Sequence, residues 1–316
     1  STTVIIKKKK NDPLISILSK SISNFIILLF HIFKTKTKTK TKELIFTSLF
    51  DGGELFIDSI VNADKKVGFI NSWDNPSSRH FFNIKYSEIY VWSPYVRDTL
   101  KKFYPNFNNV KIIGRIQDVI IPQLMDKESF YKKININSKR VLISYIHGGG
   151  YFDYMDNLKS LYNYCKKNNY FLLFRGYSEG DYSDITNSNF DSKYFKFSVP
   201  NALNIGVIND LEICDDNSDF IFYNSLLKYS KTIFTNGSTV LLDVLNYNKK
   251  GRVLLNTSTN DDYLYYLYFH LFVLNKMGGF NFVVNENFND ETNNENIQFL
   301  KQYFLGPTFN VKNFYI

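Results

Sequence analysis

Short apolar runs alternate with longer amphipathic stretches along most of this chain of 316 residues. From Glu43 onward, an apolar run repeatedly ends in a polar or glycine-containing turn, and a segment with helical spacing follows. Parallel strands need such a crossover, usually a helix, whereas antiparallel strands can be joined by a tight turn. The alternation therefore predicts an α/β fold built on parallel sheets.

The alternation occurs twice, which indicates two successive α/β halves. We place a first domain at residues 43–126 and a second at 127–316, after an N-terminal segment at 1–42. In the first half we expect strands at 44–49, 66–70, 88–92 and 110–113, and helices at 54–61 and 94–103. In the second half we expect strands at 140–146, 170–175, 195–199, 232–235 and 252–256, and helices at 127–133, 156–168, 219–229, 239–246, 263–276 and 295–305.

The net charge of +8 is concentrated at one end of the chain. Residues 1–42 contain ten Lys and a single acid, Asp12, which gives +9, and the remaining residues sum to −1. Proteins that bind nucleic acid non-specifically grip the phosphate backbone with clustered basic side chains. The body of this chain lacks that excess, so we expect no nucleic-acid partner.

An apolar window at residues 14–33 dominates the N-terminal segment, and a Lys/Thr repeat at 34–42 closes it. Lys20, Asn24 and His31 interrupt the window. We expect a core-packed helix followed by a solvated loop. An interfacial helix that contacts a membrane surface and a transmembrane helix are the alternatives.

Cysteine and histidine usage gives no metal-binding pattern. Cys165 and Cys214 lie 49 residues apart, and the histidines at 31, 80, 147 and 270 do not have ligand spacing. We expect no metal, no cofactor and a reducing, cytoplasmic location, with peripheral membrane contact through residues 1–42 as the alternative.

The segment from Asn236 to Asp243 follows an expected strand and begins a helix. Gly237 permits a tight turn, and Ser238 or Thr239 can cap the helix. Free N–H groups at such a helix start suit a diphosphate, and Asp243 could accept hydrogen bonds from ribose hydroxyls. An ordinary capped helix with a solvated Asp is the alternative.

Three further candidates follow expected strands. His147 precedes Gly148 and Gly149, whose backbone could approach a ligand closely, and the imidazole could serve as acid, base or phosphate donor. Arg175 ends an apolar strand and needs an anionic partner, either a phosphate or a structural Asp or Glu. Asp74 could act as a base, or could instead form an Asx turn or helix cap.

Several segments, in order, resemble one family of enzymes. They are Phe-Ile-Asn-Ser-Trp-Asp-Asn at 69–75, Ile-Tyr-Val-Trp-Ser at 89–93, Val-Lys-Ile-Ile-Gly at 110–114, the stretch at 223–230, Gly-Ser-Thr at 237–239 with Asp243, and Tyr-Phe-Leu-Gly-Pro at 303–307. Over residues 43–307 the chain resembles the GT-B glycosyltransferases of surface-carbohydrate biosynthesis. These are distantly related to CDP-glycerol glycerophosphotransferases and UDP-N-acetylglucosamine 2-epimerases. One departure is Arg175-Gly176-Tyr177-Ser178, where that family often has R-x-H-P.

The resemblance implies two facing Rossmann-like domains, with a shortened N-terminal half, and transfer of a sugar from a nucleotide-sugar to a glycan or lipid-linked hydroxyl acceptor without a metal. With this function we assign donor binding to Gly148, Gly149, Arg175, Gly237, Ser238, Thr239 and Asp243, and catalytic roles to Asp74 and His147. We assign Asp51, Gly52, Ser72, Trp73 and Asn75 to the acceptor side. A sugar-nucleotide epimerase, a polyol-phosphate transferase and a non-catalytic glycan-binding protein on the same fold remain alternatives.

Overall fold

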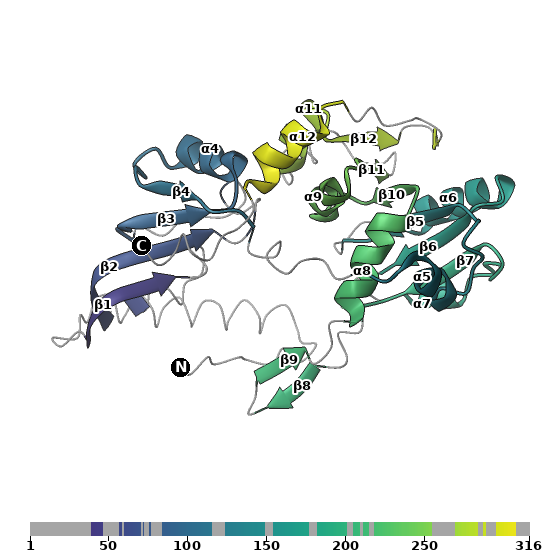
Figure 1. The fold of residues 1–316 in the computed structure, drawn as a ribbon, viewed down its shortest axis with the longest axis horizontal. Coiled ribbons are helices and arrows are strands. Elements are labelled where there is room, and N and C mark those ends of the chain that lie inside the picture. The colour runs from purple at the N-terminus through teal and green to yellow at the C-terminus, as the bar shows by residue number, and fades with distance from the viewer. Residues whose placement is uncertain are drawn as a thin grey trace, which may run out of the picture. The chain divides into compact units, whose positions relative to one another are not determined.

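The computed structural model describes residues 39–46, 57–58, 60–70, 72, 76, 84–115, 124–148, 154–176, 182–200, 205–208, 211–214, 218–254, 269–283, 287–288 and 295–307. The chain divides into two compact units (Figure 1). Unit 1 comprises residues 1–116 and 306–316, and unit 2 comprises residues 117–305. The apolar window at 14–33 lies outside the described residues. Within the described ranges, no helix has both the length and the apolar content needed to cross a membrane.

Unit 1 contains a four-stranded sheet in the order β1-β2-β3-β4, and all of its neighbouring strands are parallel. The strands are β1 (Thr39–Phe46), β2 (Val61–Ile70), β3 (Glu88–Val91) and β4 (Val110–Ile112). Helix α4 (Pro94–Phe103) connects β3 to β4, at the predicted residues. The Ser93 hydroxyl begins this helix by accepting a hydrogen bond from the Val96 N–H at 3.3 Å. The parallel α/β organisation predicted for this half is therefore confirmed.

Strand β1 corrects the prediction for the Lys/Thr repeat. Residues 39–42 were expected in a solvated loop, yet they pair with β2 from Thr39 opposite Val61. Threonine is β-branched and favours strands, and Lys40 and Lys42 are exposed at this edge of the sheet. The alternation of Lys and Thr is thus compatible with a strand. Strand β1 also crosses the position at which we separated residues 1–42 from the first domain.

Unit 2 is built on a six-stranded parallel sheet in the order β12-β11-β10-β5-β6-β7 (Figure 1). Its strands are β5 (Leu142–Ile146), β6 (Phe171–Arg175), β7 (Phe195–Ser198), β10 (Thr232–Thr235), β11 (Gly251–Leu254) and β12 (Phe280–Val283). A separate antiparallel pair, β8 (Ile205–Ile208) and β9 (Leu211–Cys214), lies between β7 and β10 in sequence. The hairpin and β12 were not predicted.

Alternate residues of the central strands pack on opposite faces of this sheet, as expected for period-2 side chains. Helix α6 (Met155–Lys167) covers the face that includes Tyr145 and Phe174. Helices α5 (Lys127–Lys133) and α8 (Ser218–Tyr229) cover the other face, which includes Ile146 and Leu173. The strands read as continuous apolar runs because both faces are buried.

The remaining helices differ from prediction in their details. Helix α7 (Ser183–Thr186) is a short addition. The predicted helix at 239–246 is one α-helical turn, α9 (Val240–Asp243), followed by a 3₁₀ segment (Val244–Tyr247) that ends at Asn248 in the left-handed region, with φ 55°. Helix α11 (Phe269–Lys276) occupies part of the predicted 263–276. The predicted helix at 295–305 is α12 (Ile297–Leu300) followed by a π-helical turn (Lys301–Leu305).

Lys249 holds the C-terminal end of α8. Its ammonium donates hydrogen bonds to the carbonyl oxygens of Leu227 and Lys228, in the last turn of the helix, and of Ser230, which follows it. Burial lowers the pKa of Lys249 to about 8, so the amine is still protonated at pH 7. Three carbonyl acceptors match the three N–H bonds of an ammonium ion and satisfy groups that the helix leaves unpaired.

We expect Lys249→Met to lower the free energy of unfolding by about 1–3 kcal/mol, because three carbonyls at the end of α8 lose a charged donor. Urea unfolding followed by circular dichroism measures the change. Lys228→Met is the matched control, since Lys228 is exposed on the same helix, and it should shift stability by less than about 0.5 kcal/mol. Equal effects of the two substitutions would mean that the cap does not stabilise α8.

Candidate functional site

The chain adds strands first to one side and then to the other side of the parallel sheet in unit 2. After β5 the chain adds β6 and β7 on one side, and after β10 it adds β11 and β12 on the other side. Strands β5 and β10 are hydrogen-bonded neighbours that end level with each other, with Ile146 opposite Thr235. In open α/β sheets, ligands bind outside the carboxyl ends of the strands at such a switch point. The loops that begin at His147 and Asn236 therefore occupy the position where this fold forms a site.

These two loops are in direct contact. The Gly148 N–H donates a hydrogen bond to Oδ1 of Asn236 at 2.8 Å. A Cβ atom at position 148 would lie 2.2 Å from Cβ of Ser238, closer than any side chain permits. Glycine is therefore required here by the close approach of the second loop, whereas the close approach to a ligand that the sequence suggested remains a prediction.

The turn after β10 has the local geometry expected for its residues. Gly237 has φ +92°, a left-handed conformation that L side chains rarely adopt. The Ser238 hydroxyl accepts a weak hydrogen bond from the Val240 N–H at 3.3 Å and lies 3.2 Å from Oγ1 of Thr235. Thr239 occupies the N-cap position of α9 without a side-chain cap. Of the two capping candidates, Ser238 bonds the start of the helix.

His147 lies in an aromatic enclosure at the end of β5. Its side chain is 6% exposed, and the rings of Tyr154, Phe174 and Tyr182 surround the imidazole with centroid distances of 5.1, 6.3 and 5.9 Å. Nδ1 lies 3.0 Å from the Tyr182 hydroxyl, and Nε2 has no hydrogen-bond partner among the described residues. Burial lowers the pKa of His147 below its usual 6.5, so the ring is neutral at pH 7.

Arg175 is paired within the protein. Its guanidinium is 2.6 Å from Oδ2 of Asp219, at the start of α8, and lies over the rings of Phe222 and Tyr223. The side chain is only 4% exposed. A structural acid, one of the two partners considered from the sequence, is thus present, and a role for Arg175 in phosphate binding remains a prediction.

Asp243 is connected to Arg175 through Tyr223, whose ring lies beneath the Arg175 guanidinium. The Tyr223 hydroxyl donates a hydrogen bond to Oδ2 of Asp243 at 2.8 Å. Arg175, Tyr223 and Asp243 therefore form a chain of contacts beside the loop at 236–239. His147 lies on the α6 face of the sheet, and Arg175 lies on the α8 face.

The other predicted site residues cannot be located in the same way. Six of them lie outside the described residues: Asp51, Gly52, Trp73, Asp74, Asn75 and Gly149. Ser72 is described two residues after β2 and is half-buried. The acceptor-side assignment and the catalytic role of Asp74 remain predictions.

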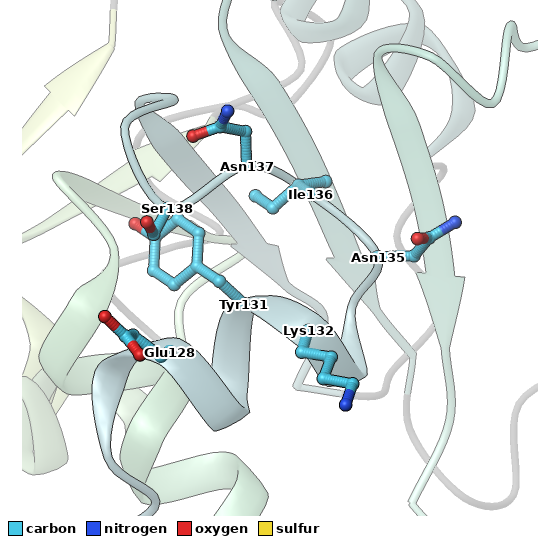
Figure 2. Close-up of a pocket in the computed structure, with 7 residues that line it drawn as sticks. All are labelled: Glu128, Tyr131, Lys132, Asn135, Ile136, Asn137 and Ser138. Carbon is cyan, nitrogen blue, oxygen red and sulfur yellow. The ribbon is translucent and has the colours of Figure 1, made fainter.

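The structure has a separate surface pocket of about 520 Å³ in unit 2. Figure 2 shows its lining, which comes from α5 and from the loop that leads into β5: Glu128, Tyr131, Lys132, Asn135, Ile136, Asn137 and Ser138. This pocket lies at the amino end of β5, so it is at the edge of the sheet opposite the switch point. None of the site residues predicted from the sequence lines it. Among the described residues, no group of three or more His, Cys, Asp or Glu side chains could hold a metal ion.

Three residues that contact the candidates were missed by the sequence analysis. Tyr182 bonds His147, Tyr223 bonds Asp243, and Asp219 pairs with Arg175. In a chain with 23 tyrosines, no motif distinguishes these two. Asp219 could have been found as the acidic residue in the first turn of a predicted helix, although nothing in the sequence placed that turn beside Arg175.

No protein-family model matches the chain, and no curated protein matches its sequence. Solved structures do match it in fold. MnaA from S. aureus, in a co-structure with UDP, is 13% identical with a TM-score of 0.54, and the alignment covers 94% of this chain and 74% of that one.

A second structure, a putative UDP-N-acetylglucosamine 2-epimerase from Listeria monocytogenes, is 10% identical with a TM-score of 0.50. The alignment covers 89% of this chain and 68% of that one. Together with the two parallel α/β sheets, these likenesses show that the chain has a GT-B fold. The fold class predicted from the sequence is therefore confirmed.

Proposed function

We propose that this protein is a GT-B glycosyltransferase that moves a sugar from a nucleotide-sugar donor to a hydroxyl of a glycan or lipid-linked acceptor. The observation that carries the proposal is the switch point between β5 and β10. There the closely packed loops at His147–Gly148 and Asn236–Thr239 meet, and a buried imidazole nitrogen has no partner among the described residues. A GT-B fold places nucleotide recognition at such a strand-end site.

In the proposed reaction, an acceptor hydroxyl transfers its proton to a general base, the role predicted for Asp74, and its oxygen attacks the anomeric carbon of the donor sugar. The bond from that carbon to the diphosphate oxygen breaks, and a nucleoside diphosphate leaves. The principal contribution of the protein is stabilisation of the charge that develops on the leaving phosphate. We assign this contribution to N–H donors at Ser238 and Thr239 and to His147, with the ribose next to Asp243.

The proposal includes a reaction that needs no metal, because protein donors carry the phosphate charge. Assays with EDTA and with added Mg²⁺ test this part separately. We expect equal rates of sugar transfer under both conditions. A loss of sugar transfer with EDTA that added Mg²⁺ restores would contradict the metal-independent reaction.

Asp243 offers the sharpest binding test. We expect Asp243→Asn to weaken UDP binding about tenfold to hundredfold, the range for a hydrogen bond to a charged group. The substitution keeps the size of the side chain, so the fold should remain intact. The loss should be far smaller for a 2′,3′-dideoxy analogue of UDP, which lacks the ribose hydroxyls.

Calorimetric titration of wild type and variant with both ligands measures these affinities. Asp184→Asn, at an exposed position in α7 of the same unit, is the matched control and should bind UDP normally. A folded Asp243→Asn variant with unchanged UDP affinity would remove the ribose role from the proposal.

A sugar-nucleotide epimerase is the second candidate, and one observation favours it. A fold neighbour with a TM-score of 0.50 is a putative UDP-N-acetylglucosamine 2-epimerase. Incubation with a panel of nucleotide-sugars, with and without acceptors, separates the two activities. A glycosyltransferase releases a nucleoside diphosphate in an acceptor-dependent manner, whereas an epimerase returns an isomerised nucleotide-sugar. Nucleotide binding that raises the melting temperature without either product would favour a non-catalytic protein.

A further inference from the structure

The contact between His147 and Tyr182 determines which imidazole nitrogen carries the proton. The Tyr182 ring lies against Gly176, where a Cβ atom would be 2.5 Å from the ring. Its hydroxyl is held 3.0 Å from Nδ1 of His147. Only the other nitrogen, Nε2, is left without a partner among the described residues.

The chemistry of the two groups sets the direction of this hydrogen bond. A phenol loses its proton near pH 10, whereas a neutral imidazole N–H is a much weaker acid. The lone pair of a neutral imidazole, which takes up a proton near pH 6.5, is in turn a better acceptor than a phenol oxygen. The favoured arrangement therefore has the Tyr182 hydroxyl donating to Nδ1, which leaves the proton of the ring on Nε2.

The surroundings keep the ring neutral. The titratable side chains that contact it among the described residues are the phenols of Tyr154 and Tyr182. Arg175, the cation at the end of the neighbouring strand β6, lies on the other face of the sheet and is paired with Asp219. No described carboxylate lies against the imidazole to favour its charged form.

We propose that Tyr182 is a positioning residue that holds His147 as a neutral Nε2–H donor, and that this N–H binds a diphosphate oxygen of the nucleotide. This inference rests on the proposed function, because it takes the switch point as the nucleotide site. It also decides among the three roles considered for His147. A neutral ring whose Nε2 already carries the proton cannot accept one there, and its N–H is too weak an acid to give the proton up. His147 is therefore a hydrogen-bond donor, and neither the base nor the acid.

The tautomer can be measured without any ligand. In full-length protein labelled with ¹⁵N-histidine, ¹⁵N chemical shifts at pH 7 distinguish a protonated nitrogen from an unprotonated one. The His147→Gln variant assigns the signals among the four histidines. We expect protonated Nε2 and unprotonated Nδ1 in the wild type. A protonated Nδ1, or an imidazolium, would overturn the inference.

Tyr182→Phe removes only the hydroxyl and should shift His147 toward a mixture of tautomers. Tyr154→Phe is the matched control, because the Tyr154 ring contacts the same imidazole, whereas the hydroxyl 3.0 Å from Nδ1 belongs to Tyr182. The control should leave the tautomer unchanged. An unchanged tautomer in Tyr182→Phe would show that another group sets it and would overturn the role of Tyr182.

UDP titration tests the donor role. His147→Gln keeps an amide N–H near the position of Nε2 and should bind UDP within about threefold of wild type, whereas His147→Leu should bind about tenfold more weakly. Equal affinity of folded His147→Leu and wild type would overturn the contact with the diphosphate. If wild-type protein has the Nε2–H tautomer but binds no nucleoside diphosphate, the proposed function fails while the tautomer assignment stands.

Discussion

Substituting Gly148 with alanine should abolish measurable UDP binding and lower the free energy of unfolding by about 1–3 kcal/mol, the usual cost of overpacking. The added Cβ atom would lie 2.2 Å from Cβ of Ser238 and 2.8 Å from its Oγ. Ser238 follows Gly237 in a tight turn, and its Cβ atom is fixed to the backbone. It therefore cannot move away as the end of a long, flexible side chain could. The loops after β5 and β10 must therefore separate, which disrupts the site at the switch point.

A double substitution makes this prediction specific. Ser238→Gly removes the atoms that the new Cβ would meet, so Gly148→Ala combined with Ser238→Gly should recover most of the stability lost by Gly148→Ala alone. Residues in contact show such non-additive effects, whereas distant residues do not. Melting temperatures and UDP titrations of the four proteins in the cycle measure the coupling. Additive losses in the double variant would show that Gly148 is required for a reason other than its contact with Ser238.

Arg252→Ala should produce the largest loss of stability, about 3–5 kcal/mol, through lost packing and unpaired carbonyls. Arg252 is 1% exposed in β11, beside the central strand β10. Its guanidinium donates to the carbonyl oxygens of Phe288 and Asn287 at 2.6 and 2.8 Å and lies over the Phe234 ring. The side chain thus ties residues 287–288 to the sheet.

Chemical denaturation of the full-length protein measures this loss. Arg252→Lys keeps the charge but lacks the planar fork that reaches two carbonyls, so an intermediate loss is expected. Lys193→Ala, at an exposed position in unit 2, should change stability by less than about 0.5 kcal/mol. A loss below about 1 kcal/mol for Arg252→Ala would mean that other groups hold residues 287–288 in place.

Much of the secondary structure in unit 2 could be predicted because its signals are local. The α5 bounds match the predicted helix, and those of β5, β6 and α8 differ by one or two residues from the predicted ranges. Continuous apolar runs and 3.6-residue periodicity are visible within a window of about a dozen residues. Strands of four residues carry little periodicity of their own, so β12 and the hairpin of β8 and β9 were missed, although β7 and β10, which have the same length, were predicted.

The sequence alone determined the α/β class, the glycine turns after the strands and the residue types able to bind a nucleotide, since each depends on neighbours along the chain. Tertiary structure decided the order of the strands, and with it the switch point between β5 and β10. It also decided that Arg175 faces Asp219, that Tyr182 bonds His147 and that Lys249 caps α8. The two pairs at the strand ends join residues 44 and 35 positions apart. No local pattern specifies such contacts, because they exist only once particular strands and helices have packed together.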